Sequence, residues 1–270
     1  MPPQAFLLRS LFVIALALWI HPPLRAEEEK PNIPKEVQEQ LVHAEELFNQ
    51  GKYAEAEKEE RAVLAFRERV LGPEHPDTLG SRHNLASALQ AQGKHAEAEQ
   101  QHRAALAISE RILGPEHPDT LDSRHNVATT LAAQGKHIEA EKEYRSVIAV
   151  RERVLGPEHA RTLVSRNDLA NALFAEGKHA EAQKEYRAVL AIQERVSGAK
   201  NPNVSQSCYN LALALEAQGK TREALEFAKR AEDACRAFLE SDHPRFKDAK
   251  ALREEVEAKL KEKEAEDRRK

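Results

Sequence analysis

The chain has 270 residues, with 41 basic and 45 acidic side chains and a formal net charge of −4. This balance indicates no strongly basic face, which argues against a nucleic-acid partner. Aromatic residues make up 5% of the sequence and apolar residues 41%, a composition that fits an alanine-rich helical protein with small, closely packed faces. The two cysteines, Cys208 and Cys235, do not stand at a metal-binding spacing.

Residues 1–26 differ in composition from everything that follows. Arg9 precedes an unbroken apolar run over residues 11–20, and Ala26 is followed by an acidic stretch that begins at Glu27. This order predicts a secretory signal peptide cleaved after Ala26, so we expect an exported protein, periplasmic or secreted, with a linker over residues 27–34. The run is shorter than the roughly 20 residues of a membrane span. The alternative is an uncleaved segment that anchors the protein to a membrane.

A period of 42 residues organises the chain after the linker. Residues 114–155 repeat residues 72–113 with 27 of 42 positions identical. Such fixed self-similarity indicates a solenoid of stacked units. The expected solenoid covers residues 35–243, with repeats at about 35–72, 73–114, 115–156, 157–198 and 199–243. Residues 244–270 are expected to form a charged C-terminal capping helix.

Each unit is expected to be a pair of helices. In the second unit Pro76 suits the first position of a helix, and Asp77 follows where the helix dipole favours an anion. Apolar residues then recur at three- and four-residue steps, which is one face of a helix. Gly93 suits a left-handed helix end. The second helix is expected from about residue 96 to residue 112, with Glu99 and Arg103 four residues apart in the favoured order.

Small residues recur at one fixed point of the second helix, as at Ala98 and Ala140. Together with the segments "LGPEHPDTL", "HNLA" and "QGKHAEAE", this pattern resembles the tetratricopeptide repeat (TPR), and the 42-residue length resembles its kinesin light chain variety. The resemblance covers roughly residues 36–244. It implies an all-α fold, a right-handed TPR superhelix (α-solenoid) of about five helical hairpins plus a C-terminal capping helix.

No sequence motif indicates catalysis or a bound metal. The chain has no glycine-rich phosphate loop and no HExxH segment. Nine of the twelve histidines recur at repeat positions, but equivalent residues of stacked hairpins lie on the order of 10 Å apart. A zinc ion needs ligands at about 2.0–2.1 Å, so such a ladder cannot share one ion. We therefore expect no enzyme, no cofactor and no metal site.

The TPR resemblance places one face of each first helix in a concave groove. The candidate peptide-groove residues on that face are His83, Asn84, Ser87, His125, Asn126, Thr129, Asn167, Asp168, Asn171, Tyr209, Asn210 and Leu213. Asparagine is a poor interior helix residue, and its amide can both donate to and accept from an extended peptide backbone. The alternative is that Asn84 and its equivalents hold neighbouring helix backbones.

Kinesin light chains have an Asn–Asn pair at this place, in a groove that takes cargo peptides. Asn84, Asn126 and Asn210 match the second Asn of that pair, and Asn167 matches the first. Asp168 departs from the pattern, which makes an acidic cargo less certain.

The sequence therefore predicts an exported protein–protein interaction scaffold that binds a partner peptide or protein through its groove. The alternative is a structural or assembly subunit that contacts partners through the solenoid ends or loops. A disulfide between Cys208 and Cys235 is a further expectation, because export favours oxidation; the alternative is two buried free thiols.

Overall fold

The structure is a computed structural model that describes residues 33–198, 202–237, 239–240 and 242–269. The predicted signal peptide, residues 1–26, and residues 27–32 of the expected linker lie outside these ranges. Within the described ranges the chain forms eleven α-helices and no strand. The helices are α1 (Lys35–Asn49), α2 (Tyr53–Val70), α3 (Pro76–Ala91), α4 (His95–Leu113), α5 (Pro118–Ala133), α6 (His137–Val154), α7 (Ala160–Ala175), α8 (His179–Ser197), α9 (Pro202–Glu216), α10 (Thr221–Arg236) and α11 (Pro244–Asp267).

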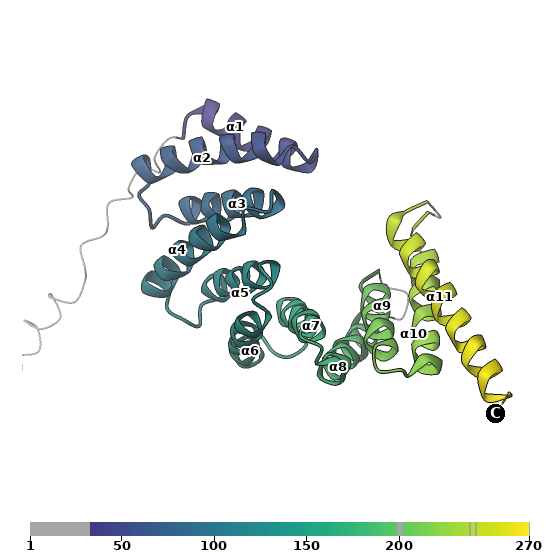
Figure 1. Ribbon diagram of the computed structural model, residues 1–270. Coiled ribbons are helices and arrows are strands. Elements are labelled where there is room, and N and C mark those ends of the chain that lie inside the picture. Colours follow the sequence, from purple (N-terminus) through teal and green to yellow (C-terminus); the bar gives the residue numbers. More distant parts are fainter. Residues whose placement is uncertain (1–32, 199–201, 238, 241, 270) are drawn as a thin grey trace, which may run out of the picture.

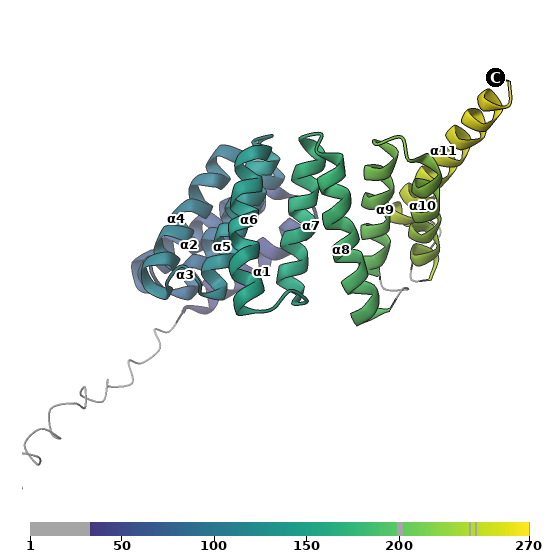
Figure 2. The same cartoon turned by 90° about the horizontal axis from the view of Figure 1, so that it is seen from below.

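Five helical hairpins stack into a curved solenoid that ends in α11. Each helix packs against its neighbours in the chain, and the stack curves so that α1 and α11 lie at the two ends of an open arc (Figure 1). In the perpendicular view the helices from α4 to α10 stand side by side in a row (Figure 2). This arrangement confirms the predicted TPR superhelix of five hairpins and a capping helix.

Glycine ends the first helix of each hairpin for a reason of backbone geometry. Gly93 has φ +77°, a conformation that residues with a side chain rarely adopt. It allows the amide of Lys94 to donate to the carbonyl of Leu89 at 2.9 Å, the bond that characterises a Schellman helix end. The sequence analysis predicted this role for Gly93.

Histidine caps the start of four helices, a role that the sequence analysis missed. In each case Nδ1 of the imidazole accepts a hydrogen bond from the backbone N–H two residues later, at 3.2 Å. The four capping residues are His75, His117, His159 and His243. A side-chain acceptor at this position satisfies one of the free N–H groups at a helix start. This explains how α7 begins at Ala160 without the proline that opens α3 and α5.

One arginine in each of three first helices ties neighbouring hairpins together. Arg82 donates to Glu68 on α2 and, at 3.0 Å, to Gln101 on α4. Arg124 and Arg166 make the equivalent bonds in the next two hairpins. These side chains are thereby committed to the packing of the solenoid.

The structure corrects the expected disulfide. Cys208 and Cys235 are both buried free thiols, as the alternative held. Cys235 stands two periods after Arg151. Its Sγ lies 3.7 Å from the carbonyl oxygen of Arg245, and the Arg151 guanidinium makes the equivalent contact with the carbonyl oxygen of Arg161. Cys208 instead stands one period after Arg166, which bonds both to Glu152 of the preceding hairpin and to Glu185 of its own.

Cys235 does not face Cys208 across the hairpin. The residue that faces Cys235 across the hairpin is Ser205, whose Oγ lies 2.8 Å from Sγ. Ser205 precedes Cys208 by three residues, roughly 4.5 Å of helix rise. Cys235 therefore meets α9 about one turn before Cys208, and the two thiols stay free.

Candidate peptide-binding groove

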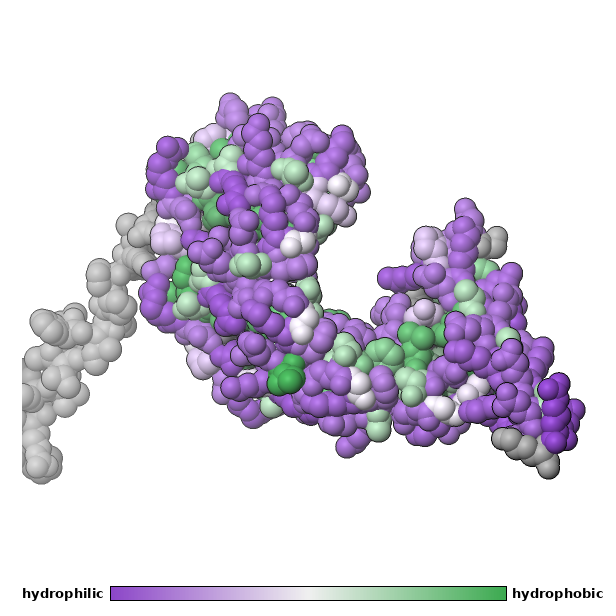
Figure 3. Space-filling view, in the orientation of Figure 1, coloured by the Kyte–Doolittle hydropathy of each residue, from purple (hydrophilic) through white to green (hydrophobic). Residues whose placement is uncertain are grey.

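The first helices of the hairpins turn one face toward the hollow side of the arc. Figure 3 shows the hollow between the two ends of the arc in profile, and the surface seen around it is largely hydrophilic with apolar residues in small patches. All twelve predicted groove residues retain solvent exposure, and Asn84, Ser87 and Asn171 are the most open of them. Such a strip of accessible polar side chains along an extended concave surface is suited to contact a partner chain over several repeats.

Polar contacts link the predicted groove residues across the boundary between the second and third hairpins. Nε2 of His83 lies 3.2 Å from Oγ of Ser123, and Nδ1 of His83 lies 3.4 Å from Nδ2 of Asn126. In the next hairpin His125 repeats this pattern, with Ser165 at 3.2 Å. The groove residues are thus held in place by one another.

Asp168 gives the groove a negative charge where the asparagine pattern breaks. Its Oδ2 lies 3.4 Å from Nε2 of His125, and its Oδ1 accepts a bond from Asn171 at 3.5 Å. Asn171 in turn accepts a hydrogen bond from Asn210 at 3.3 Å. Asn126 and Asn210 therefore contact side chains of the preceding hairpin.

A second row of groove-side residues comes from the second helices, and the sequence analysis missed it. The row consists of Glu60, His102, Tyr144, Tyr186 and Ala228, each 42 residues after the last. Tyr144 donates its hydroxyl to Thr129 at 3.1 Å, and Tyr186 donates to Asn171 at 2.6 Å. The period itself was the signal that could have revealed this row, because it fixes which positions of successive hairpins are equivalent.

Burial keeps the histidines at the N-terminal end of the groove neutral. His102 lies against His83, with 3.2 Å between their Nδ1 atoms. Burial lowers the pKa of His83, and burial together with the neighbouring His83 lowers the pKa of His102 to about 4. The partly exposed His83 therefore offers a neutral imidazole to the groove at pH 7, with the buried His102 behind it.

Free positive charge is missing from the groove side of the central hairpins. The arginines at positions 82, 124 and 166 bond to glutamates between the hairpins, and Arg161 pairs with Asp122 at 2.9 Å. Over the described α3, α5 and α7 these are all the lysine and arginine residues. Two carboxylates stand among or beside the predicted groove residues, Asp168 on α7 and the exposed Glu45 on α1.

The described ranges contain neither a candidate metal site nor a helix that could span a membrane. No group of three or more histidine, cysteine, aspartate or glutamate side chains gathers there in a way that could hold a metal ion. None of the helices in this part of the chain combines the length and the apolarity that a bilayer crossing requires.

Comparison with known proteins identifies the repeat. The sequence profile described as tetratricopeptide repeat matches residues 43–110, 80–152, 120–188 and 164–237, which together cover more than half of the chain. A search of curated proteins gave no significant match.

Three solved structures show the likeness in detail. One, from Podosopora anserina, is described as a kinesin light chain with nearly identical TPR-like repeats; it is 32% identical, covers 74% of this chain and 94% of its own, and has a TM-score of 0.66. BtubC (BKLC) from P. vanneervenii is 26% identical, with coverage of 77% and 82% and a TM-score of 0.65. The Rap conjugation gene regulator of plasmid pLS20, solved in complex with the Phr* peptide, is 14% identical, with coverage of 84% and 63% and a TM-score of 0.63, a likeness of fold alone. The chain therefore belongs to the tetratricopeptide repeat family, and its repeats are of the kinesin light chain-like type.

Proposed function

We propose that the protein is an exported, non-catalytic interaction scaffold that binds a peptide or an extended protein segment in its concave groove. The observation that carries the proposal is the continuous strip of accessible polar side chains along α3, α5, α7 and α9. Repeats of this kind are typically scaffolds, and the Rap regulator, which has the same fold, is solved with a peptide. An extended peptide leaves its backbone N–H and C=O groups free to bond to such side chains.

Selection from a random peptide library displayed on phage tests the groove. Peptides that bind the wild-type protein are measured by fluorescence anisotropy against a variant carrying Asn84→Ala and Asn126→Ala. We expect binding at least about tenfold weaker, since each lost amide bond to a peptide backbone contributes on the order of 1 kcal/mol. Gln100→Ala, at an exposed position of α4, is the matched control and leaves affinity unchanged.

The same variant decides between groove binding and a purely structural role. Alanine has better helix propensity than asparagine by up to roughly 0.7 kcal/mol, so helicity and melting temperature stay nearly unchanged if the asparagines serve a ligand. A sharp loss of stability would instead mean that they hold the hairpins together. Partners that bind the double variant as well as the wild type would favour contacts through the solenoid ends or loops.

Export has a spectroscopic test of its own. Trp19 is the only tryptophan of the chain, and it lies in the predicted signal peptide. We expect the protein purified from its native source to show tyrosine emission without tryptophan emission. Tryptophan emission, or an intact N-terminus by mass spectrometry, would mean that the segment is retained as an anchor.

A further inference from the structure

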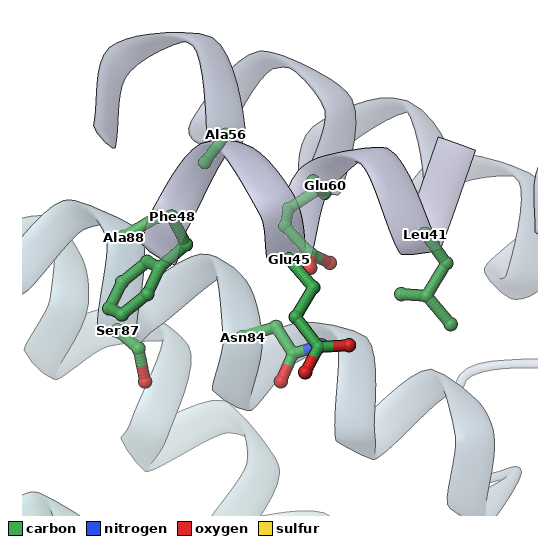
Figure 4. A pocket seen from close by; sticks show the side chains of 9 residues that line it. Leu41, Glu45, Phe48, Ala56, Glu60, Asn84, Ser87 and Ala88 are labelled. Atoms are coloured by element: carbon green, nitrogen blue, oxygen red, sulfur yellow. The ribbon is translucent and has the colours of Figure 1, made fainter. Parts of the chain in front are cut away.

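A pocket of about 390 Å³ opens at the N-terminal end of the groove, where α1, α2 and α3 meet. Its principal lining residues are Leu41, Glu45, Phe48, Glu60, Asn84 and Ser87 (Figure 4). The carboxylates of Glu45 and Glu60 point toward the amide of Asn84, and the side chains of Leu41 and Phe48 stand on either side. The pocket thus combines two apolar walls with two acidic groups.

The pocket exists because the first hairpin lacks the ring that fills this place in the next three. Glu60 is equivalent to His102, Tyr144 and Tyr186. Each of those rings reaches the first helix of its own hairpin and bonds there, to His83, Thr129 and Asn171 respectively. Glu60 is shorter, so the space that a ring would occupy stays open.

Glu60 is buried with one of its two carboxylate oxygens unpaired. The residue is 5% exposed, and its Oε2 has no hydrogen-bond partner. A buried charge is costly unless it is paired. Burial raises the pKa of Glu60 to about 7; the Asn84 amide and the Arg67 charge lower it, and the neighbouring Glu45 raises it.

The surroundings of Glu60 supply no cation that could pair with it directly. No residue that lines the pocket is basic. Arg67, on the same helix, donates instead to the carbonyl of Asp77 at 2.9 Å and to Ser81 at 2.8 Å. The second carboxylate, Glu45, is exposed at the same pocket. The pocket therefore favours a positively charged guest.

We propose that this pocket binds a basic side chain, lysine or arginine, of the partner peptide. Its alkyl stem lies against Leu41 and Phe48, and its cationic head pairs with Glu60 and Glu45. Charge-assisted hydrogen bonds of this kind are about twice as strong as neutral ones, and the long stems of basic residues pack well against apolar walls. The inference rests on the proposed groove binding, because it anchors one end of the peptide in that groove.

Titration of the isotope-labelled protein with n-butylammonium, the lysine side chain alone, tests the pocket without any peptide. We expect saturable shifts in the NMR signals of Glu60 and Asn84, and none with n-butanol, the neutral analogue of the same length. Glu60→Gln weakens the binding at least about tenfold, and Glu45→Gln weakens it less because Glu45 is exposed. Glu55→Gln, at an exposed position of α2 outside the pocket, leaves it unchanged.

Proton linkage gives a second readout of the same titration. The groups that face Glu60 are Glu45 from α1, Arg67 from its own helix α2, and Asn84 from α3. Because the cation binds the ionised carboxylate, n-butylammonium affinity rises about tenfold from pH 6 to pH 8 in the wild type, and this rise disappears in Glu60→Gln. Shifts that do not saturate, or that are equal for n-butanol or for Glu60→Gln, would overturn the proposal.

The phage-selected peptides separate this inference from the proposed function. In a peptide that needs the groove, replacement of one lysine or arginine by alanine should cost as much affinity as Glu60→Gln in the protein. If the two changes combined cost no further affinity, the result supports both the groove binding and the pocket. Groove-dependent peptides without such a residue leave the proposed function standing and refute the pocket. A library that gives no groove-dependent peptide counts against the proposed function, and the n-butylammonium titration still decides the pocket.

Discussion

The first two hairpins and the last three are built from one repeat, yet they pack differently. From α5 to α11 the buried apolar side chains form a single continuous core, which runs from Val127 to Val256. In the first two hairpins the buried side chains fall into two small clusters, one around Leu85 and one around Leu47. The C-terminal part thus shares one apolar core, whereas the apolar core of the N-terminal part is divided.

The row of groove-side residues on the second helices shows how this difference arises. Tyr144 and Tyr186 are both 2% exposed and join the continuous core. In the first two hairpins the same row carries Glu60 and His102, which cannot extend an apolar core. A period in the sequence therefore repeats the backbone, while the exchange of one side chain in each unit decides whether that unit packs tightly or leaves a site.

Truncation of a core leucine in each part tests the difference between the two. Leu173 and Leu85 are both almost completely buried, so replacement by alanine removes about 2–5 kcal/mol of local stability in either case. Because the apolar core is continuous from α5 to α11 and separate from the clusters in α1 to α4, we expect Leu173→Ala to speed hydrogen exchange from α5 to α11, and Leu85→Ala to speed it mainly in α1 to α4. Exchange mass spectrometry measures both, and an equal spread in the two variants would contradict the division.

Replacement of Glu60 should stabilise the N-terminal part at neutral and basic pH. The pKa of Glu60 is raised to about 7 in the folded protein from an ordinary value of 4.5. The folded state therefore keeps this proton while the unfolded state has lost it, and stability falls as pH rises from about 4.5 to 7. Glu60→Gln removes that loss, so we expect a gain of up to about 3 kcal/mol at pH 8 and little change at pH 4.

Urea unfolding of wild type and Glu60→Gln at both pH values measures this effect, with Glu55→Gln as control. A gain at pH 8 that remained the same at pH 4 would show that the gain comes from packing and not from the ionisation of Glu60.

Replacement of His102 by the tyrosine of the next hairpin should act in the opposite pH range. The pKa of His102 is lowered to about 4 by burial and by the charge of His83. The unfolded state takes up this proton first, so the wild type loses stability as pH falls from about 6.5 to 4. His102→Tyr removes the titrating group, and we expect about 2 kcal/mol more stability than the wild type at pH 5.

At pH 8 His102 is neutral in both the folded and the unfolded state, so its titration does not lower the stability of the wild type. We therefore expect His102→Tyr to change stability little at this pH. Tyr144 shows that the position accepts a tyrosine, whose hydroxyl would meet Ser87 as Tyr144 meets Thr129. Thermal melts across this pH range make the comparison, and a loss at every pH would indicate that the second hairpin has no room for the larger ring.

The sequence predicted the fold well because its period and its helix signals are local. Pro76, Gly93 and the apolar steps between them each specify a backbone conformation within a few residues. The TPR resemblance indicated which face of each first helix lines the groove, and the 42-residue period then gave the equivalent side chains in every hairpin.

The pocket and the free cysteines could not be predicted, because both depend on how helices are rotated against each other. Glu60 was indistinguishable from the other glutamates of α2 until its side chain was seen to point into the hairpin. Cys208 and Cys235 were expected to face each other across the last hairpin, but the residue of α9 that meets Cys235 is Ser205, one turn before Cys208. Spacing along the chain fixes axial distance and leaves rotation open.

The smallest expected effect concerns equivalent arginines on α6 and α8. Arg145 bonds to Glu141 at 2.7 Å and to Glu181 at 3.1 Å, with the side chain 46% exposed. Exposed pairs contribute about 0.2–1 kcal/mol each and are screened by salt, so the loss of stability caused by Arg145→Gln should almost vanish in concentrated NaCl.

Arg187, on α8, pairs with Glu223 and also lies 5.1 Å from the ring centre of Phe227. The packing of Arg187 on the ring is less sensitive to salt than an ion pair. We therefore expect part of the loss of stability caused by Arg187→Gln to remain in concentrated NaCl. Urea unfolding at low and high NaCl measures both, and losses that fell equally with salt would show that the ring contact adds no stability to the C-terminal part.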